Sequence, residues 1–176
     1  MEETKSSNIL YVGPIFTMSK DMVEVKGKEY QRDIVHHHGG VGVLAIRDNQ
    51  VLLVKQYRYA VQEDTYEIPA GKLEKDEDPY GCGLRELEEE SGYTTNKLTA
   101  ICTMYSTPGF CSEKIFIYQA DQLTKLQNPK PMDEDEEIET MWIPIDQAYQ
   151  MVLDGKIHDA KTILALQHAY IKKCNY

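Results

Sequence analysis

Three glutamates stand close together at the end of a predicted helix. Glu86, Glu89 and Glu90 fall on one helical face at about 100° per residue, with Arg85 to one side of them. The last turn of a helix carries a negative dipole end, so carboxylates placed there repel each other and destabilise the helix. A hard divalent cation such as Mg²⁺ or Mn²⁺ would relieve this repulsion through oxygen ligands. The alternative is a solvated acidic face with an Arg85–Glu89 ion pair.

The helix that carries these acids has signals at both ends. Asp78 can cap it and Pro79 suits its first turn. Gly92 can end it in the left-handed conformation. We expect a core-facing stripe made of Tyr80, Leu84, Leu87 and Ser91. The sequence therefore predicts a helix with one acidic face and one core face.

The spacing of residues around this helix resembles the Nudix box, the signature of the Nudix hydrolases. The matching positions are Gly71, Glu77, Arg85-Glu86, Leu87, Glu89-Glu90, Gly92 and the apolar Tyr93. The resemblance implies an α+β fold with a mixed β-sheet sandwiched between helices (α/β/α). It also implies a loop–helix–loop that binds divalent cations and cleaves nucleoside diphosphates linked to another group.

The roles within the box follow partly from the resemblance and partly from helical geometry. Glu86 and Glu90, four residues apart on one face, are the best direct metal ligands, with Glu89 close behind. The family implies that the backbone carbonyl of Ala70 completes the coordination of a metal. We expect Arg85 to hold the glutamates in place, and Glu77 to orient them or to reach a metal through water.

Residues outside the box are similar to the Nudix subgroup that cleaves ADP-ribose. QYR at 56–58 is followed by EIPAG directly before the box, which makes Arg58 a candidate for the phosphates and Glu67 for a polar contact in the pocket. Pro108 lies 15 residues after Tyr93, and Glu113 follows it in the pattern P-G-x-x-x-E. In this subgroup Glu113 would help to hold a metal or the terminal ribose. The alternatives are a structural salt bridge for Arg58 and a simple Pro-Gly turn at 108.

The general base is expected on an acidic loop. Residues 128–137 form a loop by composition, and the resemblance points to Glu136 as the base with Glu134 as a helper. A slip of one or two residues in the comparison would give the role to Glu134 or Glu137. A solvated acidic loop is the alternative interpretation.

Composition and charge bear on the partners and the cellular location of the protein. The chain has 176 residues and a formal charge of −10, which argues against general affinity for nucleic acid or anionic membranes. Its four cysteines show no CxxC pair, and the N-terminus shows no signal peptide, so a reducing cytoplasm is the simplest location. No apolar run approaches transmembrane length.

Strands are expected on both sides of residue 38. Residues 8–35 contain two or three, beginning with ILYVGPIF, and the ADP-ribose subgroup uses such a region to pair with a second subunit. We therefore expect residues 1–38 to form a dimerising strand region and residues 39–176 a catalytic domain. Arg32, on one of these strands, could reach a phosphate in its own subunit or the other, and the alternative is a surface ion pair. His36-His37-His38 resembles a metal tract, but consecutive strand residues point to opposite faces, so we interpret it as the end of a strand.

The remaining elements read as a framework for the site. Two nearly continuous apolar strands, 40–46 and 51–57, predict a centrally buried pair joined by a short turn. Two further strands surround a turn at 106–112, and another strand contains Trp142. Amphipathic helices are expected over 146–153 and from about 159 to 173.

The predicted function is Mg²⁺-dependent hydrolysis, with Mn²⁺ as a substitute, of ADP-ribose to AMP and ribose 5-phosphate. One alternative keeps the fold and changes the substrate to another nucleoside diphosphate sugar, such as ADP-glucose or GDP-mannose. Another is a sensor that binds a nucleotide metabolite without cleaving it. Sensors of this kind commonly lose box residues, whereas this chain keeps all of them and has no DNA-binding segment.

Overall fold

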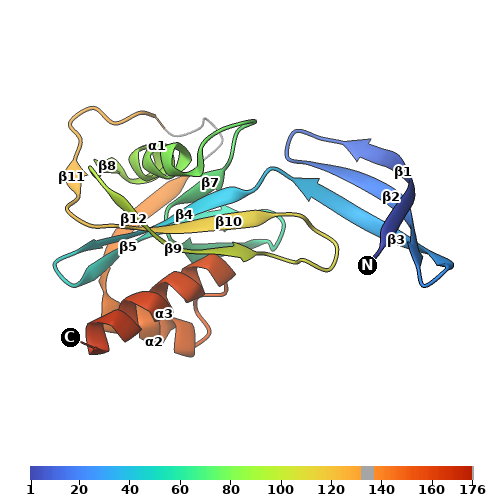
Figure 1. The fold of residues 1–176 in the computed structure, drawn as a ribbon. Coiled ribbons are helices and arrows are strands. Elements are labelled where there is room, and N and C mark those ends of the chain that lie inside the picture. The colour runs from blue at the N-terminus through green and yellow to red at the C-terminus, as the bar shows by residue number, and fades with distance from the viewer. Residues whose placement is uncertain (132–136, 176) are drawn as a thin grey trace.

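Two separate β-sheets form the framework of the molecule. The computed structural model describes residues 1–131 and 137–175. A small sheet at the N-terminus projects to one side, and a larger sheet lies between helices in the rest of the chain (Figure 1).

The N-terminal sheet is a three-stranded antiparallel meander in the order β1-β2-β3. Its strands are β1 (Glu3–Val12), β2 (Phe16–Val25) and β3 (Lys28–His37). The three strands confirm the sequence prediction, but ILYVGPIF is not a single strand. A turn separates β1 from β2, and the Gly13 N–H bonds to the Phe16 carbonyl at 3.0 Å. Pro14 explains the break, because proline has no N–H to donate to a strand ladder.

The larger sheet is mixed, with β12-β5-β4-β10-β9 as its main order. Its strands are β4 (Gly40–Arg47), β5 (Gln50–Arg58), β6 (Glu63–Glu67), β7 (Ala70–Lys72), β9 (Leu98–Tyr105), β10 (Lys114–Ala120) and β12 (Ile138–Pro144). β10 runs parallel to β4, while the other pairings are antiparallel, including β6 on β5 and β7 on β4. A short pair, β8 (Tyr93–Thr94) and β11 (Thr124–Lys125), lies beside it.

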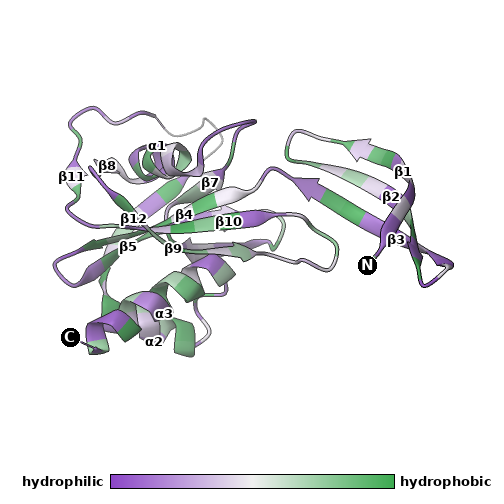
Figure 2. Ribbon diagram, viewed as in Figure 1, coloured by the Kyte–Doolittle hydropathy of each residue, from purple (hydrophilic) through white to green (hydrophobic). Residues whose placement is uncertain are grey.

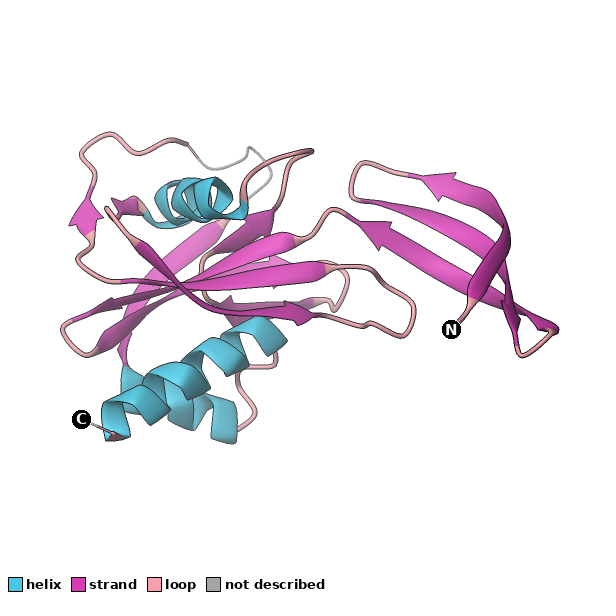
Figure 3. Cartoon of the chain, viewed as in Figure 1, coloured by secondary structure: helices cyan, strands magenta, loops and turns pink. Residues whose placement is uncertain are grey.

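Helices cover both faces of this larger sheet. α1 (Pro79–Ser91) lies on one face, and α2 (Ile145–Leu153) and α3 (Ala160–Cys174) lie on the other (Figures 1 and 3). This arrangement confirms the predicted α/β/α layers and the two C-terminal helices. Within the described residues, no helix is long and apolar enough to cross a membrane.

The core is divided by the sheet into two clusters of buried side chains. One cluster includes Leu44, Leu53 and Leu166 and lies toward α2 and α3, and the other includes Val43, Leu52 and Leu87 and lies toward α1. Much of the central part of the sheet carries the green of hydrophobic residues in Figure 2. Because alternate residues of β4 and β5 enter opposite clusters, both strands are apolar almost throughout, as the sequence predicted.

α1 begins and ends where its sequence predicts. The Asp78 side chain accepts a hydrogen bond from the Gly81 N–H at 3.2 Å, and Gly92 ends the helix at a φ of 71°. The predicted core stripe was partly wrong, because the buried residues of α1 are Cys82, Gly83, Leu87 and Glu90. The physical reason lies at Gly83, where an added Cβ would approach Val41, Val43 and Leu98 within 3.4 Å. The absence of a side chain there lets the helix lie close to the sheet, so its buried face turns toward Gly83 and Glu90 and leaves Tyr80 exposed.

Candidate active site

A cavity of about 610 Å³ opens near the junction of the two sheets, beside β7. Its walls come from the end of β3, the starts of β4 and β7, and the end of β5. Polar side chains gather on these walls, and the lining includes His37, Gln56, Arg58, Lys72, Glu113, Glu137 and Lys161 together with Ala70 and Gly71. A cavity with a few convergent polar groups is the expected form of a small-molecule site.

Arg85 holds together the acids around α1. Its guanidinium donates to Glu77 at 3.0 Å, to Glu86 at 2.7 Å and to Glu89 at 3.0 Å. It also donates to the Lys72 carbonyl at 3.2 Å, which ties the helix to the end of β7. The hydrogen bond with Glu77 is the main cause of a raised Arg85 pKa, and the same contact lowers the pKa of Glu77. This geometry matches the holding role expected for Arg85, and it includes the Arg85–Glu89 ion pair of the alternative interpretation.

Glu90 and Glu86 adjoin the cavity wall at Ala70 and Gly71. Glu90 is only 3% exposed and accepts a hydrogen bond from the Ala70 N–H at 2.8 Å. The Glu86 carboxylate lies so close to Gly71 that an added Cβ would overlap it. Gly71 is therefore required where β7 passes the helix, because any larger residue would displace this carboxylate.

The donor set on this face fits a hard divalent cation. Glu86, Glu89 and Glu90 offer only oxygen atoms, and the backbone of Ala70 lies beside Glu90. In the described part of the chain, no group of three His, Cys, Asp or Glu side chains is already arranged to hold a metal. Arg85 and the Ala70 N–H contact oxygens of these glutamates, so a bound cation would replace some of these contacts.

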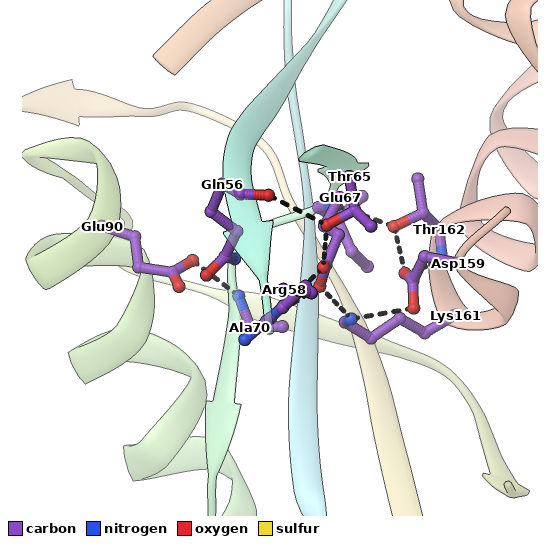
Figure 4. Close-up of polar contacts among 10 residues, drawn as sticks. Gln56, Arg58, Thr65, Glu67, Ala70, Glu90, Asp159, Lys161 and Thr162 are labelled. Carbon is purple, nitrogen blue, oxygen red and sulfur yellow. Dashed lines mark hydrogen bonds and ion pairs between the residues drawn. The ribbon is translucent and has the colours of Figure 1, made fainter. Parts of the chain in front are cut away.

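A second charged group, centred on Glu67, lies on the other side of Ala70 from Glu90 (Figure 4). Arg58 donates to both Glu67 oxygens, at 2.7 and 2.8 Å, and the Thr65 hydroxyl donates to Glu67 at 2.6 Å. Burial alone would raise the Glu67 pKa, but the hydrogen bond from Arg58 and the charge of Lys161 outweigh it and hold the pKa at about 2. Arg58 therefore both forms the salt bridge considered as an alternative and lines the cavity.

Lys161 belongs to this group, and the sequence did not indicate it. Its ammonium donates to Glu67 at 2.5 Å and to Asp159 at 3.0 Å. The sequence indicated only that a helix begins near Asp159. In the structure Asp159 caps α3 by accepting a hydrogen bond from the Thr162 N–H at 3.0 Å. The start of an amphipathic helix gave no reason to connect Lys161 with a strand 94 residues earlier.

The turn containing Pro108 is attached to the end of β3. The Val35 N–H donates to the Phe110 carbonyl at 2.8 Å, and the Ser112 N–H donates to the Val35 carbonyl at 2.9 Å. This attachment brings Glu113 to the cavity, where its carboxylate lies 3.6 Å from His37 Nδ1. Pro108 itself is exposed and does not line the cavity.

The histidine tract ends a strand, as predicted. His36 pairs with the Ser19 hydroxyl at 2.9 Å on the N-terminal sheet. His37 instead lines the cavity and accepts from the Gly39 N–H at 2.9 Å. Because the two neighbours point to opposite faces, they do not share one ligand.

The remaining predicted site residues differ in whether the structure places them at the cavity. Arg32 is on the N-terminal sheet, pairs with Glu2 at 2.8 Å and does not line the cavity of its own chain. Glu134 and Glu136 lie outside the described residues. Glu137, the third candidate for the base, lines the cavity.

Comparisons with known proteins agree with this architecture. The sequence model of the NUDIX domain matches residues 36–166. The chain is 40% identical to an ADP-ribose pyrophosphatase of Bacillus subtilis, covering 98% of this chain and 94% of the relative. It is 37% identical to a protein of Bacillus methanolicus named methanol dehydrogenase activator, with the same coverage of 98% and 94%. A crystal structure of an ADP compounds hydrolase superimposes with a TM-score of 0.84 at 19% identity, covering 99% of this chain and 94% of that one.

The chain therefore belongs to the Nudix family and is a Nudix hydrolase. The structural likeness independently shows that residues described here adopt the Nudix fold, in agreement with the expectation from the box.

Proposed function

We propose that this enzyme hydrolyses the diphosphate of ADP-ribose, giving AMP and ribose 5-phosphate, with Mg²⁺ as its cofactor and Mn²⁺ as a substitute. The observation that carries the proposal is the placement of two opposite kinds of charge beside one cavity. Glu86 and Glu90 contact its wall at Gly71 and Ala70, while Arg58 and Lys161 line it directly. The 40% identity to an ADP-ribose pyrophosphatase over nearly the whole chain supports this substrate.

In this proposal the residues of the Nudix box bind the divalent cation that contacts the diphosphate. Glu86, Glu89, Glu90 and the Ala70 carbonyl are the proposed ligands, and a divalent cation bound there would reduce the repulsion between the diphosphate and an incoming water. Arg85 keeps the glutamates in place through the contacts described above. Arg58 binds phosphate oxygens, and Glu113 contacts the metal or the terminal ribose.

A carboxylate must take a proton from the attacking water. As the water oxygen bonds to phosphorus, the bridging P–O bond breaks and the proton passes to this carboxylate. Glu136 remains the proposed base, with Glu134 as its helper, and both lie outside the described residues. Glu137 is the described acid nearest to them in sequence, and its position on the cavity wall supports a base from this loop.

A substrate panel tests the proposal. The purified protein is incubated with ADP-ribose, ADP-glucose, GDP-mannose and NADH, each with and without Mg²⁺, and nucleoside monophosphates are separated by chromatography. We expect AMP to form fastest from ADP-ribose, and only with metal. Faster cleavage of another sugar nucleotide would contradict the substrate but keep the chemistry, whereas binding without any cleavage would favour the sensor.

The N-terminal sheet supports a second proposal, about assembly. We propose that residues 1–38 form a dimerising region and residues 39–176 the catalytic domain. Every residue of β1 is exposed, and an apolar run within it, Ile9–Val12, is 46–73% exposed. An exposed apolar edge strand is the kind of surface that a second copy would cover. Arg32 would then reach a phosphate only if the pairing brought it to the partner's cavity.

We also propose a cytoplasmic location. All four cysteines, Cys82, Cys102, Cys111 and Cys174, are free thiols, as a reducing compartment would keep them.

A further inference from the structure

Lys161 is a mostly buried cation on the wall of the proposed active site. Its side chain is 12% exposed, and its ammonium lies between the carboxylates of Glu67 and Asp159. Two carboxylate contacts account for two of the three N–H donors of the ammonium. Since burying a lysine is costly unless it is paired, these contacts explain how the charge is kept there.

The surrounding structure fixes the ammonium in place. Asp159 caps α3 by accepting from the Thr162 N–H, and the buried Thr162 hydroxyl accepts from the Ile68 N–H at 2.8 Å. The start of α3 is therefore bonded to the segment that leads from β6 to β7 (Figure 4). The aliphatic part of Lys161 passes over Gly42 of β4, where an added Cβ would lie 3.6 Å from its Cδ.

The positive and negative side chains around Glu67 differ in their exposure to the cavity. Arg58 and Lys161 line the cavity, whereas Glu67 and Asp159 do not. Glu67 is only 4% exposed, while Arg58 is 42% exposed. The two positive and two negative charges balance as a group, yet the cations are the members that face the cavity. An anionic ligand would therefore meet donors first, with the carboxylates behind them.

We propose that Lys161 is a substrate-binding residue that, together with Arg58, binds the diphosphate on the side away from the box glutamates. Glu67 is then a positioning residue: it holds both cations and does not contact the substrate. This inference rests on the proposed function, because it takes the anion to be the diphosphate of a nucleoside diphosphate sugar. It adds to that proposal a residue of α3, outside the box and the strands that precede it.

The test measures binding apart from turnover. Lys161→Met keeps most of the aliphatic stem and removes the charge, and Lys173→Met is the control, because Lys173 pairs with Asp146 on the surface. ADP-ribose binding is measured by calorimetry in EDTA, and kcat and KM are measured with Mg²⁺. We expect Lys161→Met to raise Kd and KM by about tenfold, the loss of one charge-assisted hydrogen bond. Lys161→Arg should recover part of the affinity, and Lys173→Met should bind like the wild type.

A measurement on the wild-type protein covers the case in which Lys161→Met does not fold. An amine-reactive reagent is applied with and without saturating ADP-ribose in EDTA, and the modification of each lysine is followed by mass spectrometry. We expect ADP-ribose to slow modification of Lys161 several-fold and to leave Lys173 unchanged. Equal rates at Lys161, or an unchanged Kd in a folded Lys161→Met variant, would overturn the inference and leave Lys161 as a counter-ion of Glu67. Failure of wild-type cleavage would instead count against the proposed function.

Discussion

Arg85 contacts the carboxylates of Glu77, Glu86 and Glu89, and this guanidinium sets how the acids around α1 are arranged. The last turn of α1 contains no basic residue that would offset its dipole. Arg85 supplies a positive charge from one turn earlier. It leaves Glu90 on the other side of the cluster, buried against the Ala70 N–H.

Glu90→Gln separates the charge of Glu90 from its structural contact. The amide oxygen of Gln can still accept from the Ala70 N–H, so we expect the fold to remain and the melting temperature to change little. Loss of the negative charge removes a proposed metal ligand, and turnover should fall by orders of magnitude. Steady-state kinetics with ADP-ribose and Mg²⁺ measure this effect. Glu88→Gln is the matched control, because Glu88 lies on the same helix as Glu90 and its carboxylate accepts from the Lys130 N–H of a loop. A fully active, folded Glu90→Gln enzyme would rule out the role as a ligand.

Gly71→Ala tests the close approach of β7 to α1. The added methyl group would occupy the position of the Glu86 carboxylate, which must then rotate away. We expect a large loss of kcat with a small change in stability, because a flexible side chain moves and the backbone does not. Gly109→Ala is the control, since an added Cβ at Gly109 meets nothing within 4 Å. Equal activity of the two variants would show that the position of Glu86 does not matter.

Glu67 makes a testable contribution to acid stability. Its pKa is about 2 in the folded protein, below the ordinary value of 4.5. A lowered carboxyl pKa stabilises the fold fully above the unfolded pKa, and this stabilisation is lost as the pH falls from about 4.5 to about 2. The full effect is about 3 kcal/mol. Urea unfolding of wild type and Glu67→Gln should therefore show a stability difference that is largest above pH 4.5 and shrinks toward pH 2. A difference that is constant with pH would contradict this assignment.

At the scale of elements, the ends of α1 determine where the acids stand. Asp78 at one end and Gly92 at the other fix the limits of the helix between β7 and β8. The tight packing at Gly83 sets its rotation about its own axis, which turns Glu90 inward and leaves Arg85 free to reach Glu77. The site therefore depends on both the length and the rotation of one helix.

Two glycines, one inside α1 and one at its C-terminal cap, should respond oppositely to alanine. Gly92 has a φ of 71°, so Gly92→Ala should destabilise the protein by about 1 kcal/mol through backbone strain. Gly81 is exposed in the first turn of the helix, and an added Cβ would come no closer than 4.0 Å to the Asp78 carboxylate, so Gly81→Ala should stabilise by about 0.5–1 kcal/mol. Thermal or urea unfolding measures both changes. A neutral Gly92→Ala variant would contradict the account of the helix end.

At the scale of the whole molecule, the N-terminal sheet projects from the catalytic body and has no cover over β1 within the described chain (Figure 1). We expect the full chain to sediment as a dimer. Replacing Ile9 and Val12 by lysine should shift it toward monomer, because charge is costly in an apolar interface. The control replaces two exposed apolar residues elsewhere, Leu153 and Ile171, by lysine. A wild-type protein that stays monomeric across the concentration range would exclude the proposed dimer.

The sequence alone determined the parts of this protein whose signals are local. The caps of α1 and the buried alternation of β4 and β5 depend on residues that are near each other in the chain, and so do the acids of the box. For the same reason the turn at 106–112 and the C-terminal helices were predicted closely. In these cases the physical interactions that set the structure span only a few residues.

Only the tertiary structure decided which charges meet. Lys161 contacts Glu67 across 94 residues, and Glu90 contacts the Ala70 N–H across 20. Periodicity and capping carry no information about such pairs, since partners this far apart come together only when the sheet and helices pack. The same packing turned the buried face of α1 toward Gly83 and placed Glu113 and His37 at the cavity. Local sequence patterns therefore show which side chains could do chemistry, and the packing of the sheet against the helices decides which of these side chains contact each other.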